Sequence, residues 1–212
     1  MTLSGVQGFL PLSSPDEIRQ IQAVDAYPFI LGIHYARRLP CIQYAFGLFE
    51  AGELVGVVTF GQPASPSLCV GVCGSKYRNN VIELNRLVIL PGKEKCNRAS
   101  KLVGGGMKLL PKGLIVVSYA DYGQWGHIGY VYQATNFIYT GMTKERTDIF
   151  SEGGHSRHYV PGETRRQPRS AKHRYVFFTD KRMRKLLRYE QLPYPKGDSR
   201  KYDTANPTPV QG

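Results

Sequence analysis

The chain has 212 residues, with 28 Lys or Arg against 16 Asp or Glu, so its formal charge at neutral pH is +12. This length suits one packed domain, and the charge favours a polyanionic partner because neutralising phosphates releases counterions. No apolar run approaches the roughly 20 residues of a transmembrane helix, and no basic stretch followed by an apolar one opens the chain. We therefore expect a cytoplasmic protein rather than a membrane or secreted one.

The first predicted elements are two helices, a hairpin and a strand. Ser14-Pro15-Asp16-Glu17 combines a cap residue, a proline at the first helical position and a Glu three residues after the cap, which predicts a helix start. A second helix is predicted from Tyr27-Pro28 to Pro40, with His34 and Tyr35 on it. Apolar runs at 42–49 and 54–60 flank Ala51-Gly52 and predict a β-hairpin, and a strand follows at 81–90.

The second half of the chain alternates helices and strands. A helix is predicted at 97–110, although each glycine of 104–106 costs about 1 kcal/mol relative to alanine. Those glycines indicate either close backbone packing or a broken helix. The later elements are strands at 114–120, 138–143 and 175–178, a helix at 130–137 and a basic helix at 181–189. The proline-rich tail 193–212 is predicted to be disordered, which leaves 1–192 as one domain.

This order predicts an α/β fold with a mixed sheet flanked by helices. It is similar to the acyltransferase fold of the Gcn5-related N-acetyltransferase (GNAT) type. In that fold the fourth strand, here 81–90, splays from the fifth, here 114–120, and the acyl donor enters between them.

The segment before the third predicted helix departs from the GNAT donor loop. GNAT proteins carry Arg/Gln-x-x-Gly-x-Gly/Ala there, and the glycines let backbone N–H groups approach the donor pyrophosphate. Counting from Arg98, Lys101 and Val103 occupy the two glycine positions. The positive charge is kept but the bare backbone is lost, which argues against ordinary acetyl-CoA use. A cradle shifted to 104–106 stays open.

Several motifs between residues 15 and 190 together resemble the Mom family of phage adenine-modification proteins. They are His34-Tyr35, Glu83-Leu84-Asn85-Arg86-Leu87, Ser118-Tyr119-Ala120-Asp121, Gly126-His127-Ile128-Gly129 and Tyr132-Gln133-Ala134-Thr135-Asn136. The resemblance implies a transferase in the cytoplasm of the infected host that converts adenine in duplex DNA to N6-carbamoylmethyladenine. This modification protects phage DNA from host restriction.

Six residues are predicted to be catalytic, because each carries a titratable or hydrogen-bonding group on the early helix, on the strand that should border the cleft between the splayed strands, or at the end of the following strand. Period-2 alternation predicts Glu83 and Asn85 on one side of their strand, with Arg86 on the other. A helix-end histidine, an internal salt bridge and a capping aspartate are the structural alternatives. The predicted catalytic residues are His34, Tyr35, Glu83, Arg86, Ser118 and Asp121.

Two further groups of residues are predicted to bind the substrate. Aromatic and polar side chains near the Ser118–Asp121 cluster suit a flipped base, although an exposed loop tip and a buried helix tyrosine are equally ordinary roles. They are Asn85, Tyr119, Trp125, His127, Tyr132 and Asn136. The basic segment about 151–190 is predicted to contact DNA phosphates. Its candidates are Arg157, Arg165, Arg166, Arg169, Lys172 and Arg174.

The donor is predicted to be an activated glycine, as glycyl-tRNA or a glycyl thioester. N6-glycyladenine and N6-carbamoylmethyladenine are isomers, so acyl transfer followed by rearrangement gives the product that the resemblance implies. A divalent iron held by His34, Asp121 and a further His or Glu is a second hypothesis. The four cysteines (Cys41, Cys69, Cys73 and Cys96) lack zinc-site spacing and are predicted to be buried free thiols.

Two alternatives from other classes remain at this point. One is a CoA-dependent N-acetyltransferase acting on a protein or small amine, and the other is a non-catalytic DNA-binding phage protein. The sequence leaves the oligomeric state open, a homodimer included.

Overall fold

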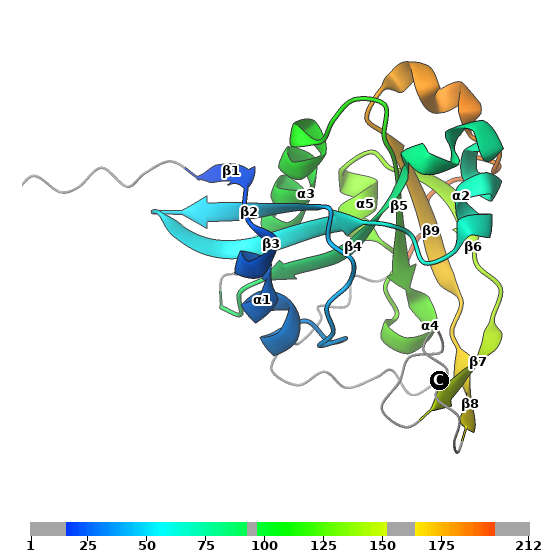
Figure 1. The fold of residues 1–212 in the computed structure, drawn as a ribbon, viewed down its shortest axis with the longest axis horizontal. Helices are drawn as coiled ribbons and strands as arrows, with labels where there is room; N and C mark the ends of the chain where they lie inside the picture. Colours follow the sequence, from blue (N-terminus) through cyan, green and yellow to red (C-terminus); the bar gives the residue numbers. More distant parts are fainter. Residues whose placement is uncertain (1–15, 93–96, 152–163, 198–212) are drawn as a thin grey trace, which may run out of the picture.

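The computed structural model describes residues 16–92, 97–151 and 164–197. Its centre is a seven-stranded mixed sheet in the order β1-β2-β3-β4-β5-β9-β6 (Figure 1). All neighbouring strands are antiparallel except β4 and β5, which are parallel. The strands of this sheet are β1 (Glu17–Gln20), β2 (Tyr44–Glu50), β3 (Glu53–Gly61), β4 (Val81–Ile89), β5 (Ile115–Asp121), β6 (Ile138–Met142) and β9 (Lys172–Phe178).

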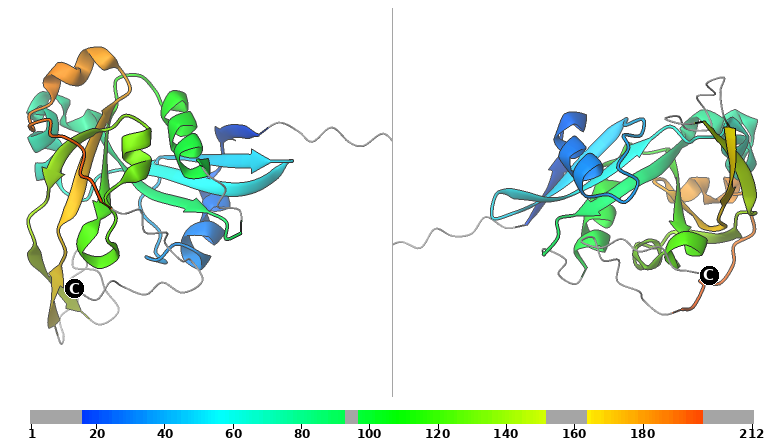
Figure 2. Two further views of the ribbon diagram at one scale, coloured as in Figure 1. Left: turned by 180° about the vertical axis from the view of Figure 1, so that it is seen from behind. Right: turned by 90° about the horizontal axis from the view of Figure 1, so that it is seen from below.

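Helices cover both faces of the sheet (Figure 2). One face carries α3 (Arg98–Leu109) and α5 (Tyr130–Ala134), whose apolar residues join one core cluster with β2–β5. The opposite face carries α1 (Tyr27–Gly32) over the first half and α2 (Pro66–Cys73) over the second. The remaining helical turns are η1 (Ala23–Ala26), η2 (Ser75–Asn80), α4 (Tyr122–Trp125) and η3 (Lys181–Leu186).

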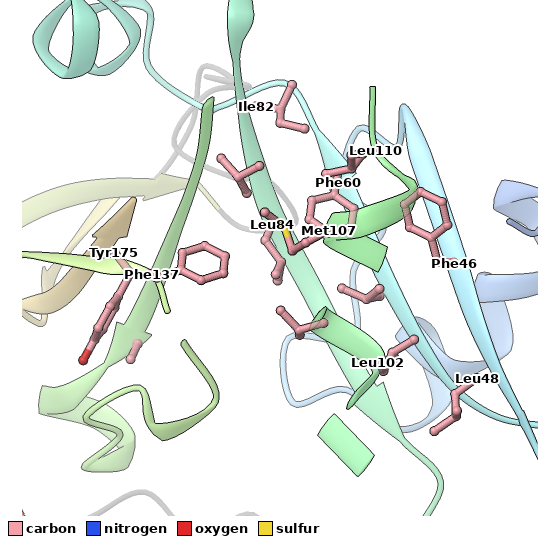
Figure 3. Close-up of a cluster of buried hydrophobic side chains, with 14 of the residues drawn as sticks. Phe46, Leu48, Phe60, Ile82, Leu84, Leu102, Met107, Leu110, Phe137 and Tyr175 are labelled. Carbon is pink, nitrogen blue, oxygen red and sulfur yellow. The ribbon is translucent and has the colours of Figure 1, made fainter. Parts of the chain in front are cut away.

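The parallel strands β4 and β5 diverge soon after they begin. They pair only over Val81–Glu83 and Ile115–Val117, although each strand continues further. The predicted splay between the fourth and fifth strands is therefore confirmed. The main core cluster still joins the two halves: Figure 3 shows Phe60, Leu84 and Met107 around β4, with Phe137 and Tyr175 on the β5 side.

The glycine run in α3 serves close packing, and the helix is unbroken. A Cβ on Gly105 would overlap the Ile18 side chain of β1, and one on Gly106 would lie 3.2 Å from atoms of Phe46 and Val58. Gly104 has more room, with Thr135 Cγ2 at 3.8 Å from such a Cβ. Two of the three glycines thus let α3 approach the first half of the sheet.

Two predictions about the first forty residues were wrong. The segment at Glu17 is strand β1 instead of a helix, because Ile18 joins the core and the strand pairs with β2. Pairing at the edge of the sheet thus determines the structure of this segment, and the capping pattern does not. Part of that pattern lies outside the described residues. Helix α1 ends at Gly32, so His34 and Tyr35 lie in the turn that follows it.

Four other segments were also predicted incompletely. The connection before β4 contains α2 and η2. The basic segment contains β8 (Thr164–Arg169), which forms a separate antiparallel ribbon with β7 (Arg146–Ser151). The predicted basic helix is the 3₁₀ turn η3. Residues 193–197 are ordered against α5 and β6, since Tyr194 Oη donates to the Phe137 carbonyl over 2.7 Å. The tail 198–212 lies outside the described residues.

Candidate active site

A β-bulge in β4 brings Glu83 and Arg86 to the same face of the sheet. Thr59 of β3 pairs with Arg86, whereas the next residue, Phe60, pairs with Leu84, so Asn85 is an extra residue in β4. The packing agrees, since Leu84 and Leu87 both join the α3-side cluster. An extra residue reverses the alternation beyond it. The prediction that Arg86 lies opposite to Glu83 was therefore wrong.

Asn85 itself is held by the scaffold. Its Oδ1 accepts from Thr59 Oγ1 over 2.6 Å, and its Nδ2 donates to the Cys41 carbonyl over 2.9 Å. These bonds join the bulge to β3 and to the segment before β2. The predicted substrate-binding role of Asn85 remains a prediction, and its observed contacts stabilise the bulge.

Arg86 is a half-buried cation that is only partly satisfied. Its two terminal nitrogens donate to the carbonyls of Asn85 over 2.6 Å and Arg38 over 2.9 Å. Its Nε is buried and has no hydrogen-bond partner among the described residues. Burial lowers the pKa of Arg86, while Tyr35 and Glu83 act in the opposite direction. Arg86 thus lies close enough to Tyr35 and Glu83 for their charges to act on it, and its buried Nε–H is uncommitted.

His34 and Tyr35 lie beside Arg86, in the turn after α1. The Ala36 amide donates to His34 Nδ1 over 3.0 Å, and the two aromatic rings have centroids 4.3 Å apart. Burial, and then the positive charge of Arg86, lower the pKa of His34 to about 3. At neutral pH the imidazole is therefore uncharged, with its proton on Nε2. His34 is placed to donate a hydrogen bond and is a weak proton acceptor.

Ser118 and Tyr132 bridge the point where β4 and β5 diverge. Ser118 Oγ donates to the Leu84 carbonyl of β4 over 3.1 Å and is also hydrogen-bonded to Tyr132. Burial raises the pKa of Tyr132 to about 12; the hydrogen bond with Ser118 opposes this shift, and Tyr35 and Glu83 add to it. Tyr132 is thus protonated at neutral pH. It comes from α5 and lies close enough to Tyr35 and Glu83 for their charges to act on its pKa.

Asp121 lies in a different setting, as the last residue of β5. Its carboxylate accepts from Ser170 Oγ over 2.7 Å and forms a buried ion pair with Lys172 Nζ. We call Asp121, Ser170 and Lys172 the clasp. Tyr119 packs with the α2-side cluster, while Ser118 faces Tyr132. The expected convergence of Ser118 with Tyr119 was therefore wrong, because neighbouring strand residues face opposite sides.

The remaining predicted substrate-binding residues follow β5. The His127 amide donates to the Asp121 carbonyl over 3.1 Å, and burial lowers the pKa of the His127 imidazole. Asn136 is exposed and has a left-handed backbone (φ 61°) after α5, a conformation that Asn tolerates. Trp125 ends α4, and its side chain lies outside the described part of the structure. Their binding roles remain predictions.

The predicted DNA-binding residues fall into three groups. Arg157 lies outside the described residues, as do the side chains of the β8 arginines Arg165, Arg166 and Arg169. Lys172 belongs to the clasp. Arg174 donates to the Thr140 hydroxyl and carbonyl, each over 2.9 Å, and its guanidinium lies 3.6 Å from the Tyr189 ring centroid.

Sequence reasoning missed Ser170 and His173. Ser170 completes the clasp, and His173 is buried with Nδ1 2.8 Å from the Tyr139 hydroxyl and no described partner for Nε2. Both lie near the start of β9, which pairs with the end of β5. Nothing in the sequence indicates that pairing, because the two strands are about fifty residues apart.

The start of α3 does not fit a CoA pyrophosphate. Arg98 is 6% exposed and is ion-paired with Glu50, while Lys101 Nζ lies 2.5 Å from Asp16 Oδ2. Val103 is buried. The basic side chains are thus committed to carboxylates, and bulk replaces the glycines on which such a site depends.

The described residues also bear on the metal, thiol and membrane predictions. They contain no group of three or more His, Cys, Asp and Glu side chains suited to a metal ion, so the iron hypothesis gains no ligand set from them. Cys69 and Cys73 are buried free thiols as predicted, whereas Cys41 is exposed, contrary to the prediction. Cys96 lies outside the described residues. No helix in 16–92, 97–151 or 164–197 is long and apolar enough to cross a bilayer.

Solved structures similar to this chain include two bacterial acetyltransferases. A Bacillus subtilis acetyltransferase in complex with CoA is 13% identical with a TM-score of 0.46, covering 77% of this chain and 98% of its own. The ribosomal-protein-S18-alanine N-acetyltransferase from Escherichia coli is 10% identical with a TM-score of 0.47, covering 76% of this chain and 92% of its own.

Sequence comparison gives a relative and a family. The protein named methylcarbamoylase mom, from Escherichia phage Mu, is 28% identical over 186 residues, which is 77% of this chain and 76% of the relative. The model of the Mom protein family matches residues 16–196, a range that contains both the residues around Arg86 and the clasp. This chain therefore belongs to the Mom protein family.

Proposed function

We propose that this protein is a transferase that modifies adenine in duplex DNA to N6-carbamoylmethyladenine and thereby hides the DNA from restriction enzymes. The observation that carries the proposal is the family match over 16–196, together with the convergence of polar residues from distant parts of that range. The relative from phage Mu is named a methylcarbamoylase, which fits this chemistry. The charge of +12 suits a DNA substrate.

The proposed catalytic group is the set of residues around Arg86, which we call the Arg86 cluster. Arg86 supplies a cation with an uncommitted Nε–H, which suits a developing carbonyl oxyanion. Glu83 lies beside it and is the proposed proton acceptor. Tyr132 is a protonated hydroxyl beside Ser118 and suits a proton donor. The cluster consists of His34, Tyr35, Glu83, Arg86, Ser118 and Tyr132.

Two residues change their proposed roles in this scheme. His34 holds its proton on Nε2 and has a pKa of about 3, so it would orient the substrate by donating a hydrogen bond. Asp121 is ion-paired with Lys172, so the role of proton acceptor is assigned to Glu83 instead. Tyr35 would complete the pocket beside Arg86.

The proposed reaction uses an activated glycine, carried as a tRNA ester or a thioester. Adenine N6 forms a bond to the glycyl carbonyl carbon, the carrier leaves with its electron pair, and one N6 proton passes to Glu83. The free glycyl amine then attacks C6 through a five-membered ring. The bond between C6 and the original N6 breaks, and that nitrogen leaves as the carboxamide with one added proton. The product is linked to C6 through NH–CH₂ and is an isomer of the first adduct.

The side chains at the start of α3 support a donor other than CoA. Arg98 and Lys101 are committed to Glu50 and Asp16, which leaves them unsuited to a CoA pyrophosphate. A CoA-dependent N-acetyltransferase is therefore the weaker alternative.

Mass spectrometry of nucleosides from cells that express the protein tests the proposal. We expect a modified adenine with the mass of the carbamoylmethyl derivative, absent from cells with the Arg86→Ala variant. Cells fed ¹³C-glycine should give labelled modified adenine. Unlabelled modified adenine would rule out the glycine route, and no modified adenine in wild-type cells would rule out the function itself.

A further inference from the structure

We propose that the β7–β8 ribbon enters a groove of duplex DNA and that the clasp fixes its direction relative to β5. This inference rests on the proposed function, because it names how that substrate is held. The ribbon is a two-stranded sheet of its own, paired from Arg146 with Arg169 to Ser151 with Thr164. It connects β6 to β9 and projects beyond the main sheet near α4 (Figures 1 and 2).

The dimensions and charge of the ribbon fit a DNA groove. Six residues of strand extend about 20 Å, and the major groove of B-DNA is about 12 Å wide and admits a two-stranded ribbon. Its twelve strand residues include four arginines and one aspartate. Arginine is the side chain that most often contacts guanine edges in that groove. The partner that fits this element is therefore a nucleic-acid duplex.

The ribbon also lacks what a self-sufficient sheet needs. An isolated two-stranded hairpin is marginally stable in water, so the ribbon depends on its base and its partner. Pro168 is paired opposite Thr147 and cannot donate to a further strand, which discourages edge-to-edge association. These features suit an arm that binds a polyanion and does not add to another sheet.

The clasp lies at the base of this arm. Ser170 and Lys172 immediately follow β8, and both bind the Asp121 carboxylate at the end of β5. The backbone continues the connection, since Thr143 N donates to the Lys172 carbonyl over 2.9 Å and Lys172 N donates to Thr143 Oγ1 over 3.0 Å. Asp121 thus joins the strand that carries Ser118 to the first residues after the arm. In this role Asp121 is a positioning residue.

The first experiment measures the affinity of the full chain for a fluorescent DNA duplex at several salt concentrations. Arg165→Ala/Arg166→Ala/Arg169→Ala should weaken binding about 100-fold and reduce the salt slope by 2 to 3, at about 0.9 per lost phosphate contact. The matched control is Lys76→Ala/Arg78→Ala/Lys108→Ala, which removes three exposed cations at the opposite end of β5. Equal effects of the two triple variants would overturn the proposal that the ribbon binds duplex DNA. A parallel measurement in which the ribbon variant loses only tRNA binding would overturn it as well.

The bases around the modified adenines test whether the ribbon reads a groove. Sequencing of modified sites should show a relaxed preference at flanking bases for the triple variant. An unchanged preference would mean that the ribbon contacts only the backbone and would overturn groove entry. If wild-type DNA carries no modified adenine, the proposed function fails, and the affinity measurements still decide whether the ribbon binds DNA.

The clasp is tested by Asp121→Asn, Lys172→Met and their combination. Each single variant should weaken duplex binding about tenfold, and the double variant should be no weaker, because both changes open the same contact. Ser170→Ala is the milder variant if Asp121→Asn does not fold. A catalytic Asp121 would instead give unchanged affinity with lost turnover, which would overturn the positioning role.

Discussion

The Arg86 cluster and the clasp differ in how their polar groups are satisfied. Arg86 keeps a buried Nε with no partner in the described structure, and His34 and Tyr132 have pKa values of about 3 and about 12. In the clasp, the Asp121 carboxylate receives a hydroxyl and an ammonium. Buried polar groups are normally paired, so the uncommitted Nε of Arg86 indicates a place for a ligand. The paired carboxylate of Asp121 instead indicates a structural contact between two segments.

This difference separates chemistry from positioning. Changes in the Arg86 cluster are expected to lower turnover while DNA affinity is kept. Changes in the clasp or the ribbon are expected to lower the affinity for DNA. Turnover should then fall only because less DNA is bound. Measuring both quantities for each variant therefore tests the division directly.

Arg86→Lys should have the largest effect on turnover, a loss of about 100-fold or more. An ammonium cannot replace a guanidinium whose terminal nitrogens bind two carbonyls while its Nε–H stays available for the substrate. Modified adenine per hour measures it. Arg38→Lys is the control, since Arg38 meets Arg86 through its backbone carbonyl. Comparable losses in both variants would show that charge in this region matters rather than the guanidinium of Arg86.

Tyr132→Phe should lower turnover by about 10- to 100-fold, as expected for loss of a general acid. The protein should lose only about 1 kcal/mol of stability, the usual net value of one hydrogen bond. Because the pKa of Tyr132 is about 12, the wild-type rate should not fall between pH 7 and 9 through this group. A variant with full turnover would remove Tyr132 from the mechanism.

The pKa of His34 predicts a pH-dependent stability. The folded-state pKa of about 3 lies below the ordinary 6.5, so the unfolded chain binds the proton more readily. Its contribution to stability is present above pH 6.5 and is lost as pH falls towards 3. Urea unfolding should show that the free energy of unfolding decreases less between pH 7 and pH 5 for His34→Gln than for the wild type. Identical decreases would mean that the histidine is not buried as described.

The smallest effects are expected from two neighbouring glycines of α3, the helix that packs on the half of the sheet holding Arg86. Gly105→Ala should destabilise the protein by about 1 to 3 kcal/mol, because its methyl group would overlap Ile18. Gly104→Ala has room and should stabilise it by up to about 1 kcal/mol. Thermal unfolding measures both changes. DNA affinity through the clasp should be unaffected by either.

The fold followed from the sequence where periodicity and turn residues were clear. The hairpin at Ala51-Gly52 and the helix at 97–110, observed at 98–109, were predicted in this way, whereas the splay of β4 from β5 was implied by the resemblance to the GNAT fold. Helix α2 was missed because its Gly, Pro and Ser residues are typical of loops. Strand β1 was missed because a capping pattern overlaps a strand that is stabilised by pairing with β2 and by the packing of Ile18 in the core.

The residues of the candidate site were named one by one from the sequence, and their roles remain predictions, but their arrangement could not be predicted. His34, Glu83, Arg86 and Ser118 were named from local patterns. Their grouping depends on tertiary facts: a bulge fixed by pairing with β3, and a parallel pair that ends at Glu83. Likewise, Asp121 meets Lys172 only because β5 pairs with β9.

The extra residue at Asn85 has a consequence for comparing sequences of this family. Glu83 and Arg86 are three positions apart, a spacing that an ordinary strand would turn to opposite sides. A relative with one residue fewer between the acid and the arginine could still be aligned letter for letter by introducing a gap. Its strand would lack the extra residue that forms the bulge, so the site would be arranged differently. Relatives should therefore be aligned on the interval between the acid and the arginine, since an insertion or deletion there costs more than most substitutions.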